Sequence, residues 1–488
     1  MIAVKNKEKI LEINLSVLLI LIMTLSSFTT SLAATKRGTL TLRANSKVIK
    51  LGKPLFFRGR LLNHSGRPIR GRAVVLQRKH GKFVIRIIRG KKKKVKRYFW
   101  RSLGSKKTNS KGIYTFGLKP TKSATYRVRS LVYRAPKPVV SRPVGVIVKP
   151  APAPQPAAPG TNAGRLGFSE GNNLVWLGDA ELDSQLNSMA ALGVKWIRHD
   201  LHWSTVQASG PNSWSWSAYD RLVNEVSKRN INILFILDYT PGWARRADAS
   251  GTMFSAPANN AQFAAYAKAA VAHFSPMGVK TYEVWNEPNL VGFWRPAPNI
   301  AVYSDLLKKT YVAIKEADPT AIVVSGGLSP AATTGGNIAP LEFASGMYAK
   351  GVKGYFDAFG FHPYSYPALP SSTANYNAWY QMFGTSPNLR GIMQQYDDSA
   401  KPVYGTEFGA PTAGSVSWSP NNSESLQAQI IDSAWAGILD KPWLTKVFIH
   451  SYKDIGTSTS TIENFFGVVR YNGTLKPAYY SVQNILSK

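Results

Sequence analysis

Eight short apolar runs alternate with amphipathic segments between residues 165 and 488, and this pattern restricts the possible folds more than any other feature. The expected strands are Leu166–Ser169, Lys195–His199, Asn232–Leu237, Thr281–Trp285, Ala321–Ser325, Ala358–Phe361, Val403–Thr406 and Lys446–Ile449. Strands that alternate with helices indicate βαβ units and a parallel sheet. Eight units over this length predict an α/β fold, a (β/α)8 TIM barrel. An open doubly wound sheet is the alternative, but no glycine-rich phosphate turn follows the first strand.

The segments between these runs show helical spacing of apolar residues. In the first, Leu182, Leu186 and Met189 share one face. Asp179 is its expected N-cap, and Gly193 lies just past its end. Two more helices are expected on Tyr219, Leu222, Val223 and Val226, and on Tyr303, Leu306, Leu307, Thr310 and Ile314, the second stopped by Asp318-Pro319.

The charge of the chain is confined to one segment. The formal net charge is +35, and residues 36–150 hold 34 Lys and Arg with no Asp or Glu. Residues 151–488 hold 24 basic and 24 acidic residues. Pro and Ala alternate between the two segments, as in a semi-rigid polyproline II spacer. We therefore expect a basic domain at 35–148, a linker at 149–164 and a neutral barrel at 165–488.

The basic segment predicts a small all-β sandwich domain. Tyr126 and Val128 alternate with arginines, and Tyr114 and Phe116 share one face of another run. Two further strands are expected at Ala73–Leu76 and Phe83–Ile88, and a turn at Asn109-Ser110-Lys111-Gly112. The pattern over residues 111–116 and 125–128 resembles Ig-like β-sandwich modules that accompany secreted bacterial enzymes.

The N-terminus predicts export. Lys5, Lys7 and Lys9 precede an apolar run at Leu15–Leu25, and small residues follow up to Ala34. This order is typical of a secretory signal peptide over residues 1–34, so we expect a secreted protein. A membrane anchor is the alternative, although the run is short for a bilayer span of about 20 residues. The absence of cysteine excludes disulfides, thiolate metal sites and cysteine nucleophiles.

Polar residues that could carry chemistry follow several of the expected strands, where the active sites of such barrels lie. Arg198 lies in the second strand, Asn286 and Glu287 follow the fourth, His362 and Tyr364 the sixth, and Glu407 the seventh. The fourth and seventh strands lie on opposite sides of an eight-fold ring, so Glu287 and Glu407 can face each other. Cleavage of a glycosidic bond requires such a pair, because one carboxyl protonates the leaving oxygen while the other stays ionised.

Five segments together carry a family resemblance: Trp196–Arg198, Val284–Asn289, Phe361–Tyr364, Thr406–Gly409 and Phe466–Tyr479. They resemble clan A glycoside hydrolases, in particular families five (cellulase-like) and thirty-nine. The resemblance implies that Glu287 is the acid/base and Glu407 the nucleophile of a retaining enzyme. It further implies that Asn286 binds the sugar 2-hydroxyl. Tyr364 and Arg198 would support the nucleophile, and His362 matches the strand-six histidine.

Taken alone, two of these residues have simpler interpretations. Glu287 fits the first turn of a helix, and Arg198 fits a structural ion pair. The combination of all the motifs favours catalysis. His199 and His202 are expected to be scaffold residues, and no His/Asp/Glu cluster has the spacing of metal ligands, so we expect no metal and no cofactor.

Aromatic residues near the strand ends can stack on sugar rings. Trp243 and Trp294 are expected in the cleft, and Trp285 mainly in packing. In the resembled families a Trp usually ends strand eight, and this chain has none there. Tyr452 or His450 is the expected substitute.

The first functional hypothesis is a retaining glycoside hydrolase, expected to cut β-linked polysaccharide or oligosaccharide. A non-catalytic wall-binding or polysaccharide-binding protein and a transglycosidase are the alternatives. The basic domain is expected to bind an anionic polymer or surface, such as a wall polymer or an acidic polysaccharide. Nucleic acid is a less favoured partner, suggested by the aromatic run Tyr98–Trp100 beside Lys91–Arg97. Adaptation to an acidic niche, or solubility alone, is the simplest alternative for the charge.

Overall fold

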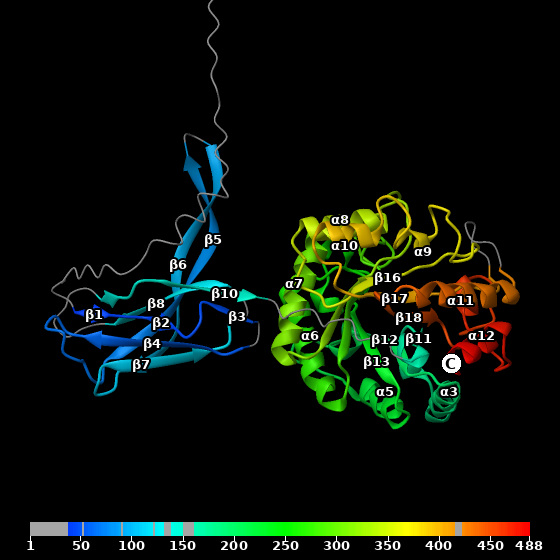
Figure 1. Ribbon diagram of the computed structural model, residues 1–488, viewed down its shortest axis with the longest axis horizontal. Coiled ribbons are helices and arrows are strands. Elements are labelled where there is room, and N and C mark those ends of the chain that lie inside the picture. The colour runs from blue at the N-terminus through cyan, green and yellow to red at the C-terminus, as the bar shows by residue number, and fades with distance from the viewer. Residues whose placement is uncertain are drawn as a thin grey trace, which may run out of the picture. The chain divides into compact units, whose positions relative to one another are not determined.

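The computed structural model describes residues 38–50, 53–88, 91–120, 123–130, 138–149, 161–414 and 422–488 (Figure 1). The chain forms two compact units. The first comprises Met1–Val48, Pro54–Leu118 and Ser123–Ile147, and the second comprises Val148–Lys488 with Ile49–Lys53 and Lys119–Lys122. The expected signal peptide and most of the expected linker lie outside the described residues. No helix in the described part of the chain is long and apolar enough to cross a membrane.

The first unit consists of short antiparallel strands and one long hairpin. Its strands are β1 (Thr39–Leu40), β2 (Arg43–Ala44), β3 (Val48–Lys50), β4 (Leu55–Leu62), β5 (Ala73–Ile88), β6 (Lys91–Lys107), β7 (Ile113–Leu118), β8 (Ala124–Ser130), β9 (Val139–Val140) and β10 (Val144–Lys149). One sheet has the order β1-β4-β2 with β7 on β4, and the other has the order β3-β10-β8-β5-β6 with β9 on β8. The two strands expected at 73–76 and 83–88 are one continuous strand, β5.

The two sheets pack through alternating apolar side chains. Phe57 of β4 and Tyr126 of β8 come from different sheets, and their ring centroids lie 4.9 Å apart. Tyr114, Phe116 and Val128 are buried as their alternation predicted. The small β-sandwich is therefore confirmed, while its assignment to Ig-like modules stays a prediction.

The second unit is an eight-stranded parallel barrel. Its strands are β11 (Leu166–Ser169), β12 (Trp196–His202), β13 (Asn232–Asp238), β14 (Thr281–Asn286), β15 (Ile322–Gly327), β16 (Phe359–Phe361), β17 (Val403–Phe408) and β18 (Leu444–His450). The sheet order is β15-β14-β13-β12-β11-β18-β17-β16. Two parallel bridges, Val324–Ala358 and Leu328–Phe361, join its ends, so the sheet closes. The predicted TIM barrel is confirmed.

Several strands extend further toward their carboxyl ends than predicted. β12 continues to His202, β13 to Asp238 and β17 to Phe408. The predictions stopped where the apolar run stopped, but backbone pairing between neighbouring parallel strands continues past that point. As a result, polar side chains at the mouth of the barrel are held by ladder hydrogen bonds rather than by loops.

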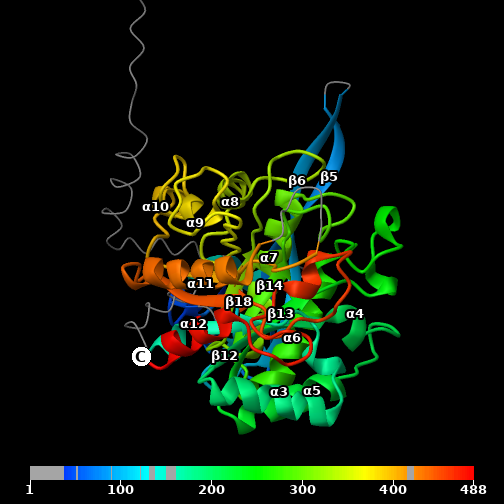
Figure 2. The ribbon, with the colours of Figure 1, turned by 90° about the vertical axis from the view of Figure 1, so that its right-hand side faces the viewer.

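Helices surround the strands (Figure 2). The α-helices are α2 (Asn162–Arg165), α3 (Asp179–Ala191), α4 (Trp203–Val206), α5 (Ser217–Lys228), α6 (Asn260–Phe274), α7 (Ile300–Ala317), α8 (Pro340–Ala349), α9 (Ala378–Gln381), α10 (Leu389–Gln395), α11 (Glu424–Leu439) and α12 (Pro477–Leu486). The 3-10 helices are η1 (Leu174–Trp176), η2 (Gly242–Ala244), η3 (Ala247–Ala249), η4 (Ser275–Met277) and η5 (Ile462–Phe465).

Two details of these helices differ from prediction. The N-cap of α3 is Gly178, and Asp179 is instead the first helical residue, where its charge still favours the helix N-terminus. The predicted linker 149–164 overlaps α2, and Asn162 Nδ2 donates to the Ile485 carbonyl 2.9 Å away. The chain therefore packs on the barrel unit a few residues earlier than its composition suggested.

The barrel has an inner and an outer apolar layer, which follow from the two-residue period of a strand. Leu234 and Ile236 of β13 lie in a small buried cluster with Tyr404 and Phe448. Their neighbours Ile233, Phe235 and Leu237 pack in the larger core that includes the helices. This double burial explains why the strands are continuous apolar runs in the sequence.

The barrel closure gives a test of the fold at Gly360 in β16. A Cβ at this position would lie 2.3 Å from the Ser325 carbonyl oxygen of β15, and backbone cannot easily move away. Gly360→Ala should lower the free energy of unfolding of the barrel by about 1–3 kcal/mol. Urea denaturation followed by tryptophan fluorescence measures this, because 12 of the 13 tryptophans lie in residues 161–488.

Gly437→Ala is the matched control. Gly437 lies in α11, and a Cβ there would meet no atom within 4 Å. This change should raise the free energy of unfolding by about 0.5–1 kcal/mol, because alanine favours the helix. If both substitutions shifted stability in the same direction, the tight β15–β16 approach would not be what closes the barrel.

Candidate active site

Glu287 and Glu407 face each other at the mouth of the barrel. Glu287 directly follows β14 and is buried, and Glu407 lies near the end of β17 with its side chain 14 % exposed. His362, directly after β16, is buried against both, with Nδ1 2.9 Å from Glu287 Oε1 and 3.5 Å from Glu407 Oε2. One carboxylate oxygen from each glutamate and a ring nitrogen of His362 lie within 4.8 Å of one another.

The guanidinium of Arg198 on β12 organises the floor of the site. Its Nε donates to Glu283 Oε2 at 2.7 Å, and its terminal nitrogens donate to Asn286 Oδ1 at 2.8 Å and to Ser169 Oγ at 2.9 Å. It also pairs with Glu407 Oε1. Arg198 and Glu283 are fully buried, so this network is shielded from solvent. The guanidinium therefore links β12 to β11, β14 and β17.

The surroundings keep Glu407 ionised. Burial opposes its charged form, but the charge of His362 and then that of Arg198 outweigh burial and lower the pKa of Glu407 to about 2. The Tyr364 hydroxyl also donates to Glu407 Oε2 at 3.1 Å. A carboxylate held in this way is an anion at any pH near neutrality.

The backbone around Glu287 is strained. Trp285 and Glu287 have φ of 72° and 47°, a left-handed conformation that residues with side chains rarely adopt. Such a conformation costs about 1–3 kcal/mol per residue and persists only where the surroundings enforce it. The Glu287 N–H donates to the Gly327 carbonyl at 3.1 Å, which ties the turn to β15. The chain thereby places both Asn286 and Glu287 at the site.

A glycine next to the site leaves room for the histidine. A Cβ on Gly327, the last residue of β15, would lie closer than 3 Å to the imidazole of His362 and to Thr406 Oγ1. The Gly327 N–H also donates to Glu283 Oε1 at 2.8 Å. His362 therefore reaches both glutamates only because residue 327 has no side chain.

Of the two tryptophans expected to stack on sugar, Trp243 is partly exposed and Trp294 is buried. Trp243 is half-buried, with Nε1 donating to the Gln207 carbonyl at 2.7 Å. The expectation that Trp294 lines the cleft is wrong, because this side chain is 1 % exposed and packs on Trp285 and Tyr303. Its position after a strand suggested the cleft, but its indole fills the layer between strand and helix.

The two candidates for the missing strand-eight Trp also differ. Tyr452 is 3 % exposed, bonds to Ser188 Oγ of α3 through its hydroxyl and packs edge-on against Phe168, so it does not floor the site. His450 ends β18 and packs on Phe466. Burial disfavours its charge, but hydrogen bonding to Glu463 and the charge of Glu407 raise the pKa of His450 to about 9. The strand-eight position is thus occupied by a cationic ring.

Three residues near the site were not found from the sequence. Glu283 and Ser169 both bond to Arg198, and the Tyr239 hydroxyl accepts a hydrogen bond from Asn286 Nδ2 at 3.4 Å. A charged residue in the middle of an apolar, fully buried strand was a signal for Glu283. Ser169 and Tyr239 carried no such signal, because small and aromatic residues are common at strand ends.

Two groups of side chains in the described residues have the proximity that metal binding requires. They are Glu287–His362–Glu407 and Asp200–His202–Asp238. The first is the carboxylate pair described above. The second lies at the ends of β12 and β13 and includes His202, which the sequence indicated as scaffold.

The (β/α)8 barrel and the two glutamates that face each other at the ends of strands four and seven are the arrangement expected from the resemblance to clan A glycoside hydrolases. Residues 158–440 match the family model described as Cellulase (glycosyl hydrolase family 5). This match covers more than half of the chain, and the chain belongs to that family. It is a glycosidase.

Solved structures support the fold. The chain is similar to a family 39 glycoside hydrolase from Bacteroides cellulosilyticus WH2, with 18 % identity over 92 % of this chain and 82 % of that one and a TM-score of 0.52. It is also similar to a monomeric β-xylosidase from Caulobacter crescentus CB15, with 20 % identity over 67 % and 69 % of the two chains and a TM-score of 0.50. A search of curated proteins finds no match.

The buried network predicts a large stability effect at Arg198. Arg198→Met should lower the free energy of unfolding by about 3–5 kcal/mol, because Glu283 would remain buried without a charged partner. Urea denaturation measures this change. Arg246→Met is the control: its pair with Asp248 is about half exposed and should contribute about 0–1 kcal/mol. Equal effects of the two substitutions would mean that the buried network does not hold the site together.

Proposed function

We propose that the protein is a secreted retaining glycoside hydrolase that cleaves O-glycosidic bonds in a polysaccharide or oligosaccharide. We expect these bonds to have the β configuration. The observation that carries the proposal is the pair Glu287 and Glu407 around His362, with carboxylate oxygens within 4.8 Å. Carboxyl groups of retaining enzymes stand about 5–5.5 Å apart, and those of inverting enzymes about 6.5–9.5 Å. One oxygen of each glutamate within 4.8 Å fits the shorter gap of the retaining class better than the longer one, so direct attack by Glu407 is favoured.

In the first step, a Glu407 oxygen attacks the anomeric carbon. The bond to the leaving oxygen breaks, and its electron pair stays on that oxygen, which takes the proton from the Glu287 carboxyl. A covalent glycosyl–Glu407 ester results. The low pKa of Glu407 suits this role, because the attacking group must be an anion while its neighbour holds a proton.

In the second step, the ionised Glu287 takes a proton from a water molecule. The water oxygen attacks the anomeric carbon, the ester bond breaks, and Glu407 leaves as a carboxylate. Two displacements at the same carbon retain its configuration. If a sugar hydroxyl replaces the water, the same steps transfer a glycosyl group, so a transglycosidase is the nearest alternative.

The neighbouring residues have supporting roles in this proposal. Arg198 and Tyr364 bond to the nucleophile and hold it in position. His362 Nδ1 contacts both glutamates and can donate to either as the charge moves between them. Asn286, held by Arg198, is placed to bind a sugar hydroxyl next to the reacting carbon. This set of contacts argues against a non-catalytic binding protein, which has no need of an ionised carboxylate beside a proton donor.

The proposal predicts the behaviour of the nucleophile variant. Glu407→Gly should reduce hydrolysis of a polysaccharide cut by the wild type by at least about 10³-fold, because no covalent intermediate can form. The same variant should use an activated glycosyl fluoride of inverted configuration for synthesis, since the cavity left by the side chain accepts that fluoride. A reducing-sugar screen and product chromatography measure the two activities.

Glu316→Ala is the control for this experiment, since Glu316 is a surface glutamate paired with Lys268. It should leave both activities unchanged. Glu287→Ala should also lose hydrolysis. Inverted configuration of the product released by the wild type, followed by NMR, would rule out Glu407 as a nucleophile.

We further propose that the basic domain holds the enzyme on an anionic polymer, such as a wall polymer or acidic polysaccharide. In its described residues, Lys79 lies over the ring of Tyr98 and Arg127 over that of Trp100, at 4.3 and 4.2 Å from the ring centroids. Tyr98 and Phe99 are about half exposed. A surface of cations and aromatic rings without any acid favours a polyanion as partner.

Removal of the basic domain tests this proposal. A chain without residues 35–150 should hydrolyse soluble substrate within about threefold of the full chain, and should no longer bind an anionic polysaccharide column. The full chain should elute with added salt, because displaced counterions drive its binding. A neutral polysaccharide column is the control. Equal retention of both chains on the anionic column would refute binding through the basic domain. Tighter binding to DNA than to acidic polysaccharide would identify nucleic acid as the partner of this domain.

A further inference from the structure

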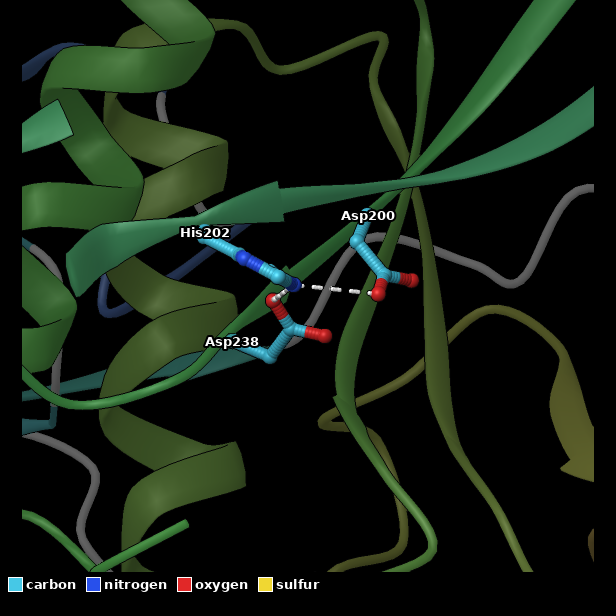
Figure 3. Close-up of side chains that lie close together, drawn as sticks. All are labelled: Asp200, His202 and Asp238. Carbon is cyan, nitrogen blue, oxygen red and sulfur yellow. Dashed lines mark hydrogen bonds and ion pairs between the residues drawn. The ribbon is translucent and has the colours of Figure 1, made fainter. Parts of the chain in front are cut away.

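Three side chains at the ends of β12 and β13 converge beside the glutamate pair. Asp200 and His202 are two residues apart on β12, so both point to the same face, and His202 stands in register with Asp238, the last residue of β13. Figure 3 shows the imidazole of His202 between the two carboxylates. The parallel pairing of these strands therefore creates the cluster.

The distances within the cluster match those between ligands of one ion. His202 Nε2 lies 3.1 Å from Asp200 Oδ2 and 3.9 Å from Asp238 Oδ1. One ligand atom from each of the three residues lies within 4.8 Å of the others. Ligands at about 2.0–2.2 Å from a metal ion are separated by about 3–4 Å, so a small rotation of the side chains would suffice.

Asp238 is buried without a hydrogen bond. Its side chain is 0 % exposed, and neither carboxylate oxygen has a hydrogen-bond partner. The guanidinium of Arg198 is already bonded to Glu283, Asn286 and Glu407. A buried carboxylate of this kind normally pairs with a cation or coordinates a metal.

We propose that Asp200, His202 and Asp238 bind a divalent first-row transition-metal ion, with Zn²⁺ as the probe. One imidazole and two carboxylates suit Zn²⁺, whereas Ca²⁺ prefers oxygen ligands alone and more of them. The side chains of Asp200 and His202 are 13 % and 9 % exposed, so solvent reaches the site and an ion can enter. This site is separate from the glutamate pair and does not depend on the proposed hydrolase activity.

The surroundings of His202 fit metal binding through Nε2. Its Nδ1 lies 3.1 Å from the side-chain amide of Asn172, whose oxygen accepts from the Tyr219 hydroxyl. Metal binding through Nε2 requires this amide to be turned over, so that its oxygen accepts from Nδ1–H and its nitrogen donates to the Tyr219 hydroxyl oxygen. A ligating histidine usually donates its second N–H to such an oxygen. Asn172 is therefore the positioning residue of the site.

The ion would support the neighbouring glutamate pair without touching it. Asp238 is followed by Tyr239, whose hydroxyl bonds to Asn286. An ion that joins β12 and β13 at their ends would hold Tyr239, and through it Asn286, in place. The sequence-based expectation of no metal rested on the spacing of ligands within single segments. Asp238 comes from a different strand, β13, so this spacing did not reveal it as a third ligand.

Direct measurement of Zn²⁺ bound to the protein tests the proposed site. The full chain, stripped with chelator and dialysed against Zn²⁺, should retain about one equivalent by mass spectrometry of the metal, and Zn²⁺ should raise its thermal midpoint. Asp238→Asn and His202→Gln should weaken Zn²⁺ binding by about 10- to 100-fold or more in competition with a chromophoric chelator. Ca²⁺ and Mg²⁺ should not replace Zn²⁺.

Two control variants locate the binding. Asp220→Asn alters a surface Asp–His pair, with 2.6 Å between His273 Nε2 and Asp220 Oδ1, that has no third carboxylate, and it should retain full Zn²⁺ binding. Glu287→Gln should retain it too. Loss of Zn²⁺ from Glu287→Gln but not from Asp238→Asn would place the ion at the glutamate pair and overturn the proposal. Absence of stoichiometric Zn²⁺ in the wild-type chain would also overturn it, and would mean that a proton alone balances Asp238.

Discussion

The buried guanidinium of Arg198 is the interaction on which the site depends. It reaches from β12 to Ser169 on β11, to Glu283 and Asn286 on β14 and to Glu407 on β17. A buried ion pair adds little net stability in general, because desolvation offsets attraction. Its effect here is on geometry and charge. The planar donors set the position of the proposed nucleophile, and the positive charge helps keep that carboxylate ionised.

The two glutamates gain different properties from the strands that carry them. Glu407 lies within a regular strand and receives hydrogen bonds from Arg198 and Tyr364. Glu287 lies on a left-handed turn, and its N–H bond to the Gly327 carbonyl ties this turn to β15. A ring of parallel strands brings these environments within reach of one sugar carbon. Asp200 and Asp238 lie at the ends of the neighbouring strands β12 and β13, and no hydrogen bond from the described residues reaches the Asp238 carboxylate.

The proposed chemistry and the proposed attachment lie in different parts of the chain. Residues 151–488 hold as many acidic as basic residues, and Arg198 pairs with Glu283 and Glu407 in a buried site. Residues 36–150 contain no acid, and the rings of Tyr98 and Trp100 lie under Lys79 and Arg127. The charges around Arg198 act at short range in a buried site, whereas those of residues 36–150 act at longer range through water. Added salt should therefore weaken the interactions of the basic segment more than those of the site.

The sequence by itself determined the number and order of the barrel strands, the sandwich and the proposed glutamate pair. The strands follow from local periodicity in the sequence. The glutamate pair follows from the rule that polar residues after parallel strands meet at one edge of the sheet, and this rule needs only the positions of the strand ends in the sequence. Only the tertiary structure decided that Trp294 and Tyr452 are core residues, that Glu283 completes the Arg198 network and that Asp238 joins Asp200 and His202. Each of these depends on which side chains from distant segments share one space, and burial and partner choice are set by that packing rather than by spacing along the chain.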